Sequence, residues 1–207
     1  MTYFELKVTG LSEAERSIAG AAKRMNSTVI RSVAEEAQLL RKMIVKGLRD
    51  QAPGGDRILP LSPMTIAMRK LPRKGAKRGR RGSTKALIYN GDLIGGVNAK
   101  KQQPVWWTVG VHREERSKDG KSLADIAIIQ EKGTRAYVIT VTPKMHRFSI
   151  FLMMQGVLKA PWPVGKTLRC KIPARPFLEP TYVEWGQEAE SRFSKRIENG
   201  ILGLKAS

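Results

Sequence analysis

The sequence contains one cysteine, few aromatic residues and no long apolar run. Cys170 cannot form an intrachain disulfide, and a lone thiol cannot build a cysteine zinc site, so a reducing compartment is expected. A membrane span needs roughly 18 consecutive apolar residues, and the longest candidate, residues 148–160, is interrupted by Gln155 and Gly156. The N-terminal residues also lack the apolar stretch of a secretory signal. We therefore expect a soluble protein that is made in the cytoplasm.

Patterns typical of catalysis are missing as well. His112 and His146 have no metal ligand at a useful spacing, and no serine sits in a G-x-S-x-G context. Most carboxylates stand beside Lys or Arg in helical patterns, as expected for surface ion pairs. The sequence predicts no enzyme, no catalytic residue, no metal site and no cofactor. A nuclease that holds a metal with scattered carboxylates is the weakest alternative.

Positive charge is abundant. The 207 residues include 38 Lys and Arg against 18 Asp and Glu, a formal net charge of +20, which indicates an anionic partner. The densest stretch, residues 69–85, has nine basic residues among its seventeen and no acidic one. We expect a mobile basic loop that contacts DNA or an acidic protein, with a purely solubilising role as the alternative. The candidate contacts are Arg69, Lys70, Arg73, Lys74, Lys77, Arg78, Arg80, Arg81 and Lys85.

The apolar patterning predicts an α+β fold in a single domain over residues 1–207. We expect a small, mostly antiparallel sheet, with a long helix from the N-terminal half and a C-terminal helix packed on it. The run at 123–134 fits a strand or a helix. Helices are expected at 11–26, where Ser12 and Glu15 form a capping box, at 27–49, and at 60–70, where Ser62 is the N-cap. A last helix is expected to start at a capping box of Thr181 and Glu184. Strands are expected at 3–8, 105–111, 136–143, 145–153 and 168–174, and an Asn-Gly turn within 86–99.

Two short stretches are candidate subunit interfaces. Trp106 and Trp107 are adjacent in a predicted strand, so they face opposite sides; one belongs to the core, and the other is free for a neighbouring subunit or, less favoured, a nucleic-acid base. In "KIPARPFLEP" the prolines restrict the backbone around Arg175 and Phe177, which could present both side chains rigidly to a neighbour. The alternative is a tight corner between strand and helix with Phe177 in the core, and both can hold.

The order of six stretches resembles the phage virion-morphogenesis and tail-completion proteins, which include the Mu-type morphogenesis protein and minor tail components of siphophages. The resemblance covers roughly residues 30–200. A Leu-Ile-x-x-Gly-x-Leu turn is matched by residues 87–93, a Glu-x-Gly-Thr by residues 131–134, and a Pro-Ala-Arg-Pro-Phe-Leu by residues 173–178. Asn90 stands where that family more often has Thr. The stretches are "PLSPMTI", "KALIYNGDL", "WWTVGV", "IIQEKGT", "ITVTPKMHRF" and "IPARPFLEP".

The resemblance implies a structural virion protein that forms a ring, often a hexamer, at the head–tail neck or the upper end of the tail. Such a ring completes the tail and joins it to the head. The implied partners are copies of the chain, neighbouring neck or connector proteins, tail-terminator or tail-tube proteins, and genome DNA as a further contact. The alternative is a nucleic-acid-binding protein, without enzymatic activity, that uses the basic loop. The residues expected at the subunit interface are Trp106, Trp107, Arg175 and Phe177.

Overall fold

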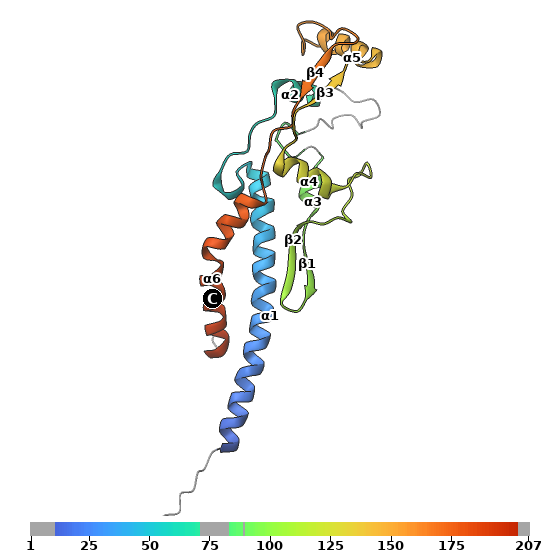
Figure 1. The fold of residues 1–207 in the computed structure, drawn as a ribbon. Helices are drawn as coiled ribbons and strands as arrows, with labels where there is room; N and C mark the ends of the chain where they lie inside the picture. The colour runs from blue at the N-terminus through green and yellow to red at the C-terminus, as the bar shows by residue number, and fades with distance from the viewer. Residues whose placement is uncertain (1–10, 71–82, 89, 203–207) are drawn as a thin grey trace, which may run out of the picture. The chain divides into compact units, whose positions relative to one another are not determined.

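The computed structural model describes residues 11–70, 83–88 and 90–202. About 56% of these residues are helical and 13% lie in strands, which confirms the α+β class (Figure 1). None of the helices in these ranges is long and apolar enough to cross a bilayer. The expected strand at 3–8 lies outside the described residues.

The chain divides into two compact units. The first comprises Met1–Leu39, Ala99–Thr108 and Gly186–Ser207, and the second comprises Leu40–Asn98 and Val109–Trp185. Because the helices α1 and α6 contribute residues to both units, this division does not test the expected single domain, which stays a prediction.

The first element is one long helix, α1 (Leu11–Asp50), of 40 residues. Two helices with a break near residue 26 were predicted, and this was wrong. Asn26 and Ser27 are only mild helix breakers, and the Ser27 hydroxyl donates to Arg24 O at 2.8 Å, which satisfies it within the helix. With neither Gly nor Pro at this point, the helix continues.

The next elements follow local sequence signals closely. A short 3₁₀ helix, η1 (Pro53–Gly55), precedes α2 (Pro63–Lys70). The predicted N-cap is confirmed, because Thr65 N donates to Ser62 Oγ at 3.2 Å. In the predicted Asn-Gly turn, Gly91 is left-handed (φ 83°) and starts the short helix α3 (Asp92–Gly95). The strands β1 (Val97–Gln103) and β2 (Trp106–Val111) then form an antiparallel hairpin.

The run at 123–134, which fitted either class, is a helix, α4 (Leu123–Lys132). The strand β3 (Tyr137–Thr140) pairs antiparallel with β4 (Thr167–Cys170), as a second two-stranded sheet. The prediction that residues 145–153 form the partner of β3 was wrong, because they lie in the helix α5 (Pro143–Met154). Thr142 is the N-cap of this helix, and its side chain accepts from Met145 N at 3.3 Å. Pro143 occupies the first helical position.

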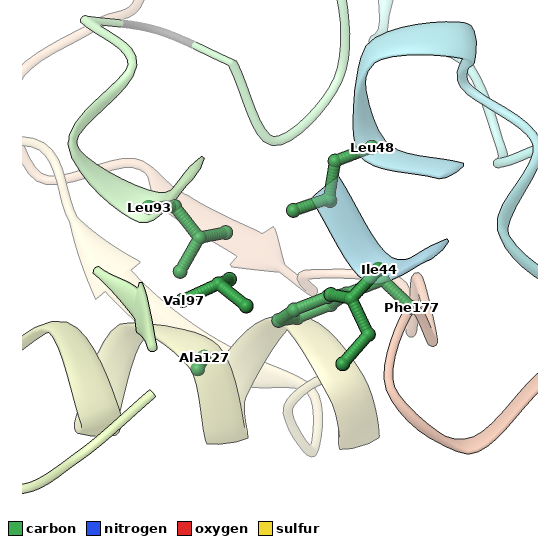
Figure 2. Packing of buried hydrophobic residues seen from close by; sticks show 6 residues of the cluster. All are labelled: Ile44, Leu48, Leu93, Val97, Ala127 and Phe177. Atoms are coloured by element: carbon green, nitrogen blue, oxygen red, sulfur yellow. The ribbon is translucent and has the colours of Figure 1, made fainter. Parts of the chain in front are cut away.

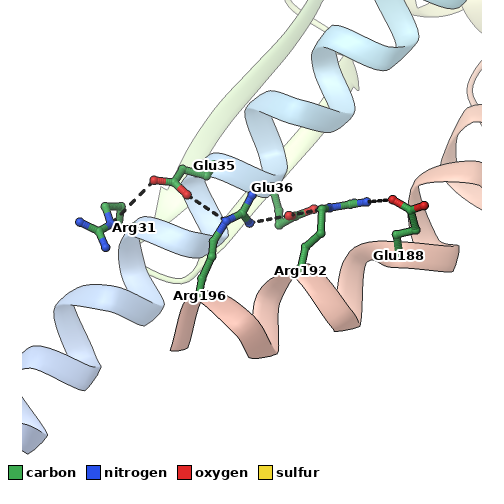
Figure 3. Close-up of polar contacts among 6 residues, drawn as sticks. All are labelled: Arg31, Glu35, Glu36, Glu188, Arg192 and Arg196. Carbon is green, nitrogen blue, oxygen red and sulfur yellow. Dashed lines mark hydrogen bonds and ion pairs between the residues drawn. The ribbon is translucent and has the colours of Figure 1, made fainter. Parts of the chain in front are cut away.

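In the first unit, the C-terminal helix α6 (Glu179–Leu202) packs on α1 through polar groups. Glu36 is buried on α1, and its carboxylate accepts from Arg192 Nε at 3.1 Å, from Arg192 Nη2 at 3.0 Å, and from Arg196 (Figure 3). Hydrogen bonding to Glu36 raises the pKa of the Arg192 guanidinium. A Cβ at Gly200 would lie 2.8 Å from Thr28 Cβ, so the helices approach closely there.

The second unit contains an apolar core assembled from distant parts of the chain. Figure 2 shows its side chains turned toward a common centre. They come from α1, α3, β1 and α4, and from the segment just before α6. Phe177 is the largest of them and is fully enclosed, so its truncation to Ala would cost about 3–5 kcal/mol. The six core residues are Ile44, Leu48, Leu93, Val97, Ala127 and Phe177.

Candidate functional site

Two stretches named in the sequence analysis lie against each other in the second unit. Thr134 N donates to Ile172 O at 2.9 Å, and Ile172 N donates back to Thr134 Oγ1 at 3.0 Å. Arg175 N donates to Gln130 O at 2.6 Å. Residues 130–134 and 172–179 thus form one hydrogen-bonded unit, which we call the junction.

Gly133 allows the closest approach within the junction. Its φ of 70° and ψ of −170° belong to a region that is essentially restricted to glycine. A Cβ at this position would lie 2.7 Å from Ala174 N and 2.8 Å from Ile172 O. A side chain here would therefore force the two stretches apart, in addition to straining the backbone.

Glu131 caps the start of the C-terminal helix, although it lies more than forty residues earlier in the sequence. Its Oε2 accepts from Phe177 N at 2.9 Å and from Leu178 N at 3.2 Å, and its Oε1 accepts from Glu179 N at 3.0 Å. The carboxylate therefore satisfies three amides at the start of α6, where negative charge also favours the helix dipole.

The capping box predicted at Thr181 and Glu184 was wrong. The helix already begins at Glu179, and the Thr181 hydroxyl donates backwards to Phe177 O at 2.9 Å. Thr181 is fully buried, so its hydroxyl needs this partner.

The structure places Arg175 and Phe177 inside the subunit, which corrects their assignment to a subunit interface. Arg175 is only 7% exposed, and its guanidinium donates to Leu59 O at 2.8 Å and to Pro60 O at 3.1 Å. Burial lowers the pKa of this guanidinium. Phe177 is 0% exposed in the core. The alternative of a tight corner with Phe177 in the core describes this stretch, and the prolines orient the two side chains inward.

The two tryptophans differ in exposure, as the alternation of a strand requires. Trp106 is 56% exposed and stands next to exposed Val105 at the turn of the β1–β2 hairpin. Trp107 is half-buried, and its Nε1 is enclosed without a hydrogen-bond partner in the described part of the chain. Trp106 is thus the one of the pair that is free to contact a partner, and the interface role of both stays a prediction.

The basic stretch is described only at its two ends. Arg69 Nη1 donates to Ser83 O at 2.7 Å and to Lys85 O at 2.9 Å, while Lys85 Nζ donates to Arg49 O at 2.7 Å. These contacts bring the two ends of the stretch together, and Lys70 is exposed beside them. The remaining candidate contacts lie outside the described residues: Arg73, Lys74, Lys77, Arg78, Arg80 and Arg81.

The histidines have ordinary structural contacts. His146 Nδ1 donates to Trp162 O at 2.6 Å, and His112 Nε2 lies 3.3 Å from Asn98 O. Across the described ranges, no group of three or more His, Cys, Asp and Glu residues is arranged to hold a metal ion. Cys170 is a free, half-buried thiol in β4.

Comparison with known proteins gives no relative. No protein-family model matches the chain, and neither a curated protein nor a solved structure matches it.

Proposed function

We propose that this chain is a structural virion protein, one subunit of a ring at the head–tail neck or at the upper end of a phage tail. In this role it completes the tail and joins it to the head by contacts with its own copies and with neighbouring ring and tube proteins. The chain then acts through shape and association, and no chemical step is assigned to it.

The junction is the observation that carries this proposal. The Glu-x-Gly-Thr and Pro-Ala-Arg-Pro-Phe-Leu stretches that give the resemblance are far apart in sequence, yet they bind each other through Glu131, Gly133 and Thr134. In the first motif Glu131, Gly133 and Thr134 make these contacts, and in the second motif Arg175 donates its amide to Gln130 and Phe177 fills the core. This supports the view that the two motifs belong to one inherited structural unit, as the resemblance implies.

Exposed apolar side chains support an assembling subunit. Trp106, Met154 and Tyr182 are each more than half exposed, and each stands next to or near further exposed apolar residues. Large apolar side chains that remain exposed in clusters are typical of protein contact surfaces. A ring uses two different surfaces of each subunit, since one patch must meet a different patch of the next copy.

The test is the mass and shape of the purified full chain. We expect sedimentation velocity to give a species that is a small multiple of 23.1 kDa, and negative-stain images to show rings. Trp106→Ser should shift the distribution toward monomer, whereas Val164→Ser, which removes another exposed apolar side chain, should not. A chain that stays monomeric at every concentration and salt, and that binds no virion component, would refute the proposal.

The high positive charge favours a second candidate, a nucleic-acid-binding protein that uses residues 69–85. The net charge is +20, and Arg69 holds the two ends of the basic stretch together. This candidate predicts binding of DNA or RNA by the monomer, with a steep salt dependence that is lost when the basic residues within 73–81 are changed to Gln. If the same changes leave ring formation intact, assembly and nucleic-acid binding are separate properties.

A further inference from the structure

A second cationic site lies in the second unit beside the junction, and the described residues that line it lie outside the stretch 69–85. It is an open hollow of about 820 Å³. Its four charged lining residues are Lys132 at the end of α4, Arg135 before β3, Arg169 in β4 and Lys171 just after β4. Arg169 is paired with Val138 across the β3–β4 sheet, which fixes its place beside the loop that follows α4.

The four cations have no counter-charge in the hollow. All four side chains are exposed, and none has a hydrogen bond or an ion pair within the described part of the chain. Among the described residues, no carboxylate lines the hollow. The nearest acid in sequence, Glu131, is engaged by three amides at the start of α6. Like charges gathered in this way repel one another, and a bound anion would relieve the repulsion.

Two arginines of α6 differ from those of the hollow, because acidic side chains pair with them. Arg192 and Arg196 are neutralised by Glu36, with further ion pairs to Glu188 and Glu35 respectively. Exposed basic residues without a partner also occur elsewhere in the described part of the chain, for example Arg113 and Arg147, but the hollow gathers four of them around one opening. They mark it as a place where an external anion supplies the missing charge.

We propose that this hollow binds the phosphodiester backbone of a nucleic acid. Between the cations, the lining that the described residues provide consists of Gly133, Thr134 and Ala136, with no aromatic or large aliphatic side chain among them. Protein interfaces have an apolar or aromatic centre, whereas phosphate contacts need mainly cations and small polar groups. The lining matches the second description, and the forked donors of Arg135 and Arg169 suit phosphate oxygens.

The hollow is held in shape by the junction. Thr134 makes two hydrogen bonds to Ile172, and Gly133 fixes the closest approach of the two stretches. The backbone that carries Lys132 and Arg135 is therefore ordered before any ligand arrives, which reduces the entropy lost on binding. This inference does not depend on the ring, because a single subunit contains all four cations.

The experiment measures binding of a fluorescein-labelled 20-nucleotide DNA, single-stranded and duplex, to the full chain by anisotropy between 50 and 200 mM salt. The site variant is Arg135→Gln with Arg169→Gln. The control is Arg113→Gln with Arg147→Gln, which also removes two positive charges, but from exposed positions outside the hollow. A labelled Glu-rich peptide of similar charge is titrated in parallel.

Loss of two phosphate contacts should lower the salt slope for duplex by about 1.8 and weaken binding at 0.1 M salt by at least about tenfold. The control should stay within about twofold of wild type. A second variant, Lys132→Gln with Lys171→Gln, removes the other two positive charges of the hollow and should weaken binding similarly. Circular dichroism of each variant checks folding.

Three results would overturn the proposal. Site and control variants could weaken binding equally, which would mean diffuse attraction by net charge. Both site variants could bind DNA like wild type, which would place all binding elsewhere, for example on residues 69–85. The acidic peptide could bind as tightly as DNA and be lost in the site variants, which would make the hollow a protein-docking site. If the same preparation forms no rings, that result contradicts the proposed function but not the phosphate-binding site.

Discussion

Replacing Glu131 by Gln tests the capping of α6 most directly. The amide keeps one oxygen, which can still accept from Phe177 and Leu178, but its NH₂ group then faces the amide of Glu179, donor against donor. A lost hydrogen bond to a charged group costs about 1.5–3 kcal/mol, and the lost charge at the helix start a further 0.3–1 kcal/mol. Because Glu131 is partly exposed, we expect a total near the lower end, about 2 kcal/mol.

Hydrogen exchange reports this loss where it occurs. A 2 kcal/mol change corresponds to about 30-fold faster exchange of the amides of Phe177, Leu178 and Glu179 if local opening governs their exchange. The melting temperature should fall by about 4–8 °C for a chain of this size. The matched control is Glu184→Gln, the same chemical change at an exposed position of α6 that has no partner among the described residues; it should stay within about 0.5 kcal/mol of wild type.

Unchanged exchange at residues 177–179 together with an unchanged melting temperature in Glu131→Gln would contradict this expectation. That result would mean that water satisfies these amides equally well and that the carboxylate does not hold the junction. Equal losses in the Glu131 and Glu184 variants would also contradict it, because the effect would then come from net charge.

Three further changes probe the packing. In thermal melts, Gly133→Ala should destabilise the fold by about 3 kcal/mol or more. The control Gly165→Ala should cost only about 1 kcal/mol, because Gly165 has a similar left-handed φ but open space around it. Equal losses would show that crowding at Gly133 does not matter. Glu36→Ala leaves Arg192 without its main partner and should cost about 3 kcal/mol by urea unfolding, whereas a change below 1 kcal/mol would show that the ion network contributes little. Ser32→Ala removes a buried hydroxyl that has no hydrogen-bond partner in the described ranges, so it should raise the unfolding free energy by about 1 kcal/mol. A decrease would show that this hydroxyl does form a stabilising hydrogen bond.

The sequence predicted a helix start correctly where the residues that cap the helix are close together in the sequence. The start of α2 was predicted correctly, because Ser62 and Pro63 act within the same helical turn. The same type of signal, Thr142 before Pro143, starts α5, but the Phe and Ile content of the following run suggested a strand. There the cap was the better guide, since apolar runs of this length do not distinguish a strand from a buried helix.

The candidate site could be predicted only in its parts. Both motifs of the junction were recognised, and a corner with Phe177 in the core was one of the two alternatives for the proline-rich stretch. Their mutual binding could not be predicted, because Glu131 finds its partners 46 to 48 residues away and no periodicity encodes such a pairing. The cations of the hollow also lie in separate elements and form no run in the sequence.

The position of Phe177 has a consequence for synthesis. The aromatic ring that fills the core of the second unit follows Ala127, its nearest core neighbour in sequence, by 50 residues. At roughly 5–20 residues per second, the ribosome needs about 2.5–10 s to reach it. During this interval Ile44, Leu48 and Val97 have no aromatic partner, so the core of the second unit is completed only when the proline-rich stretch has been made.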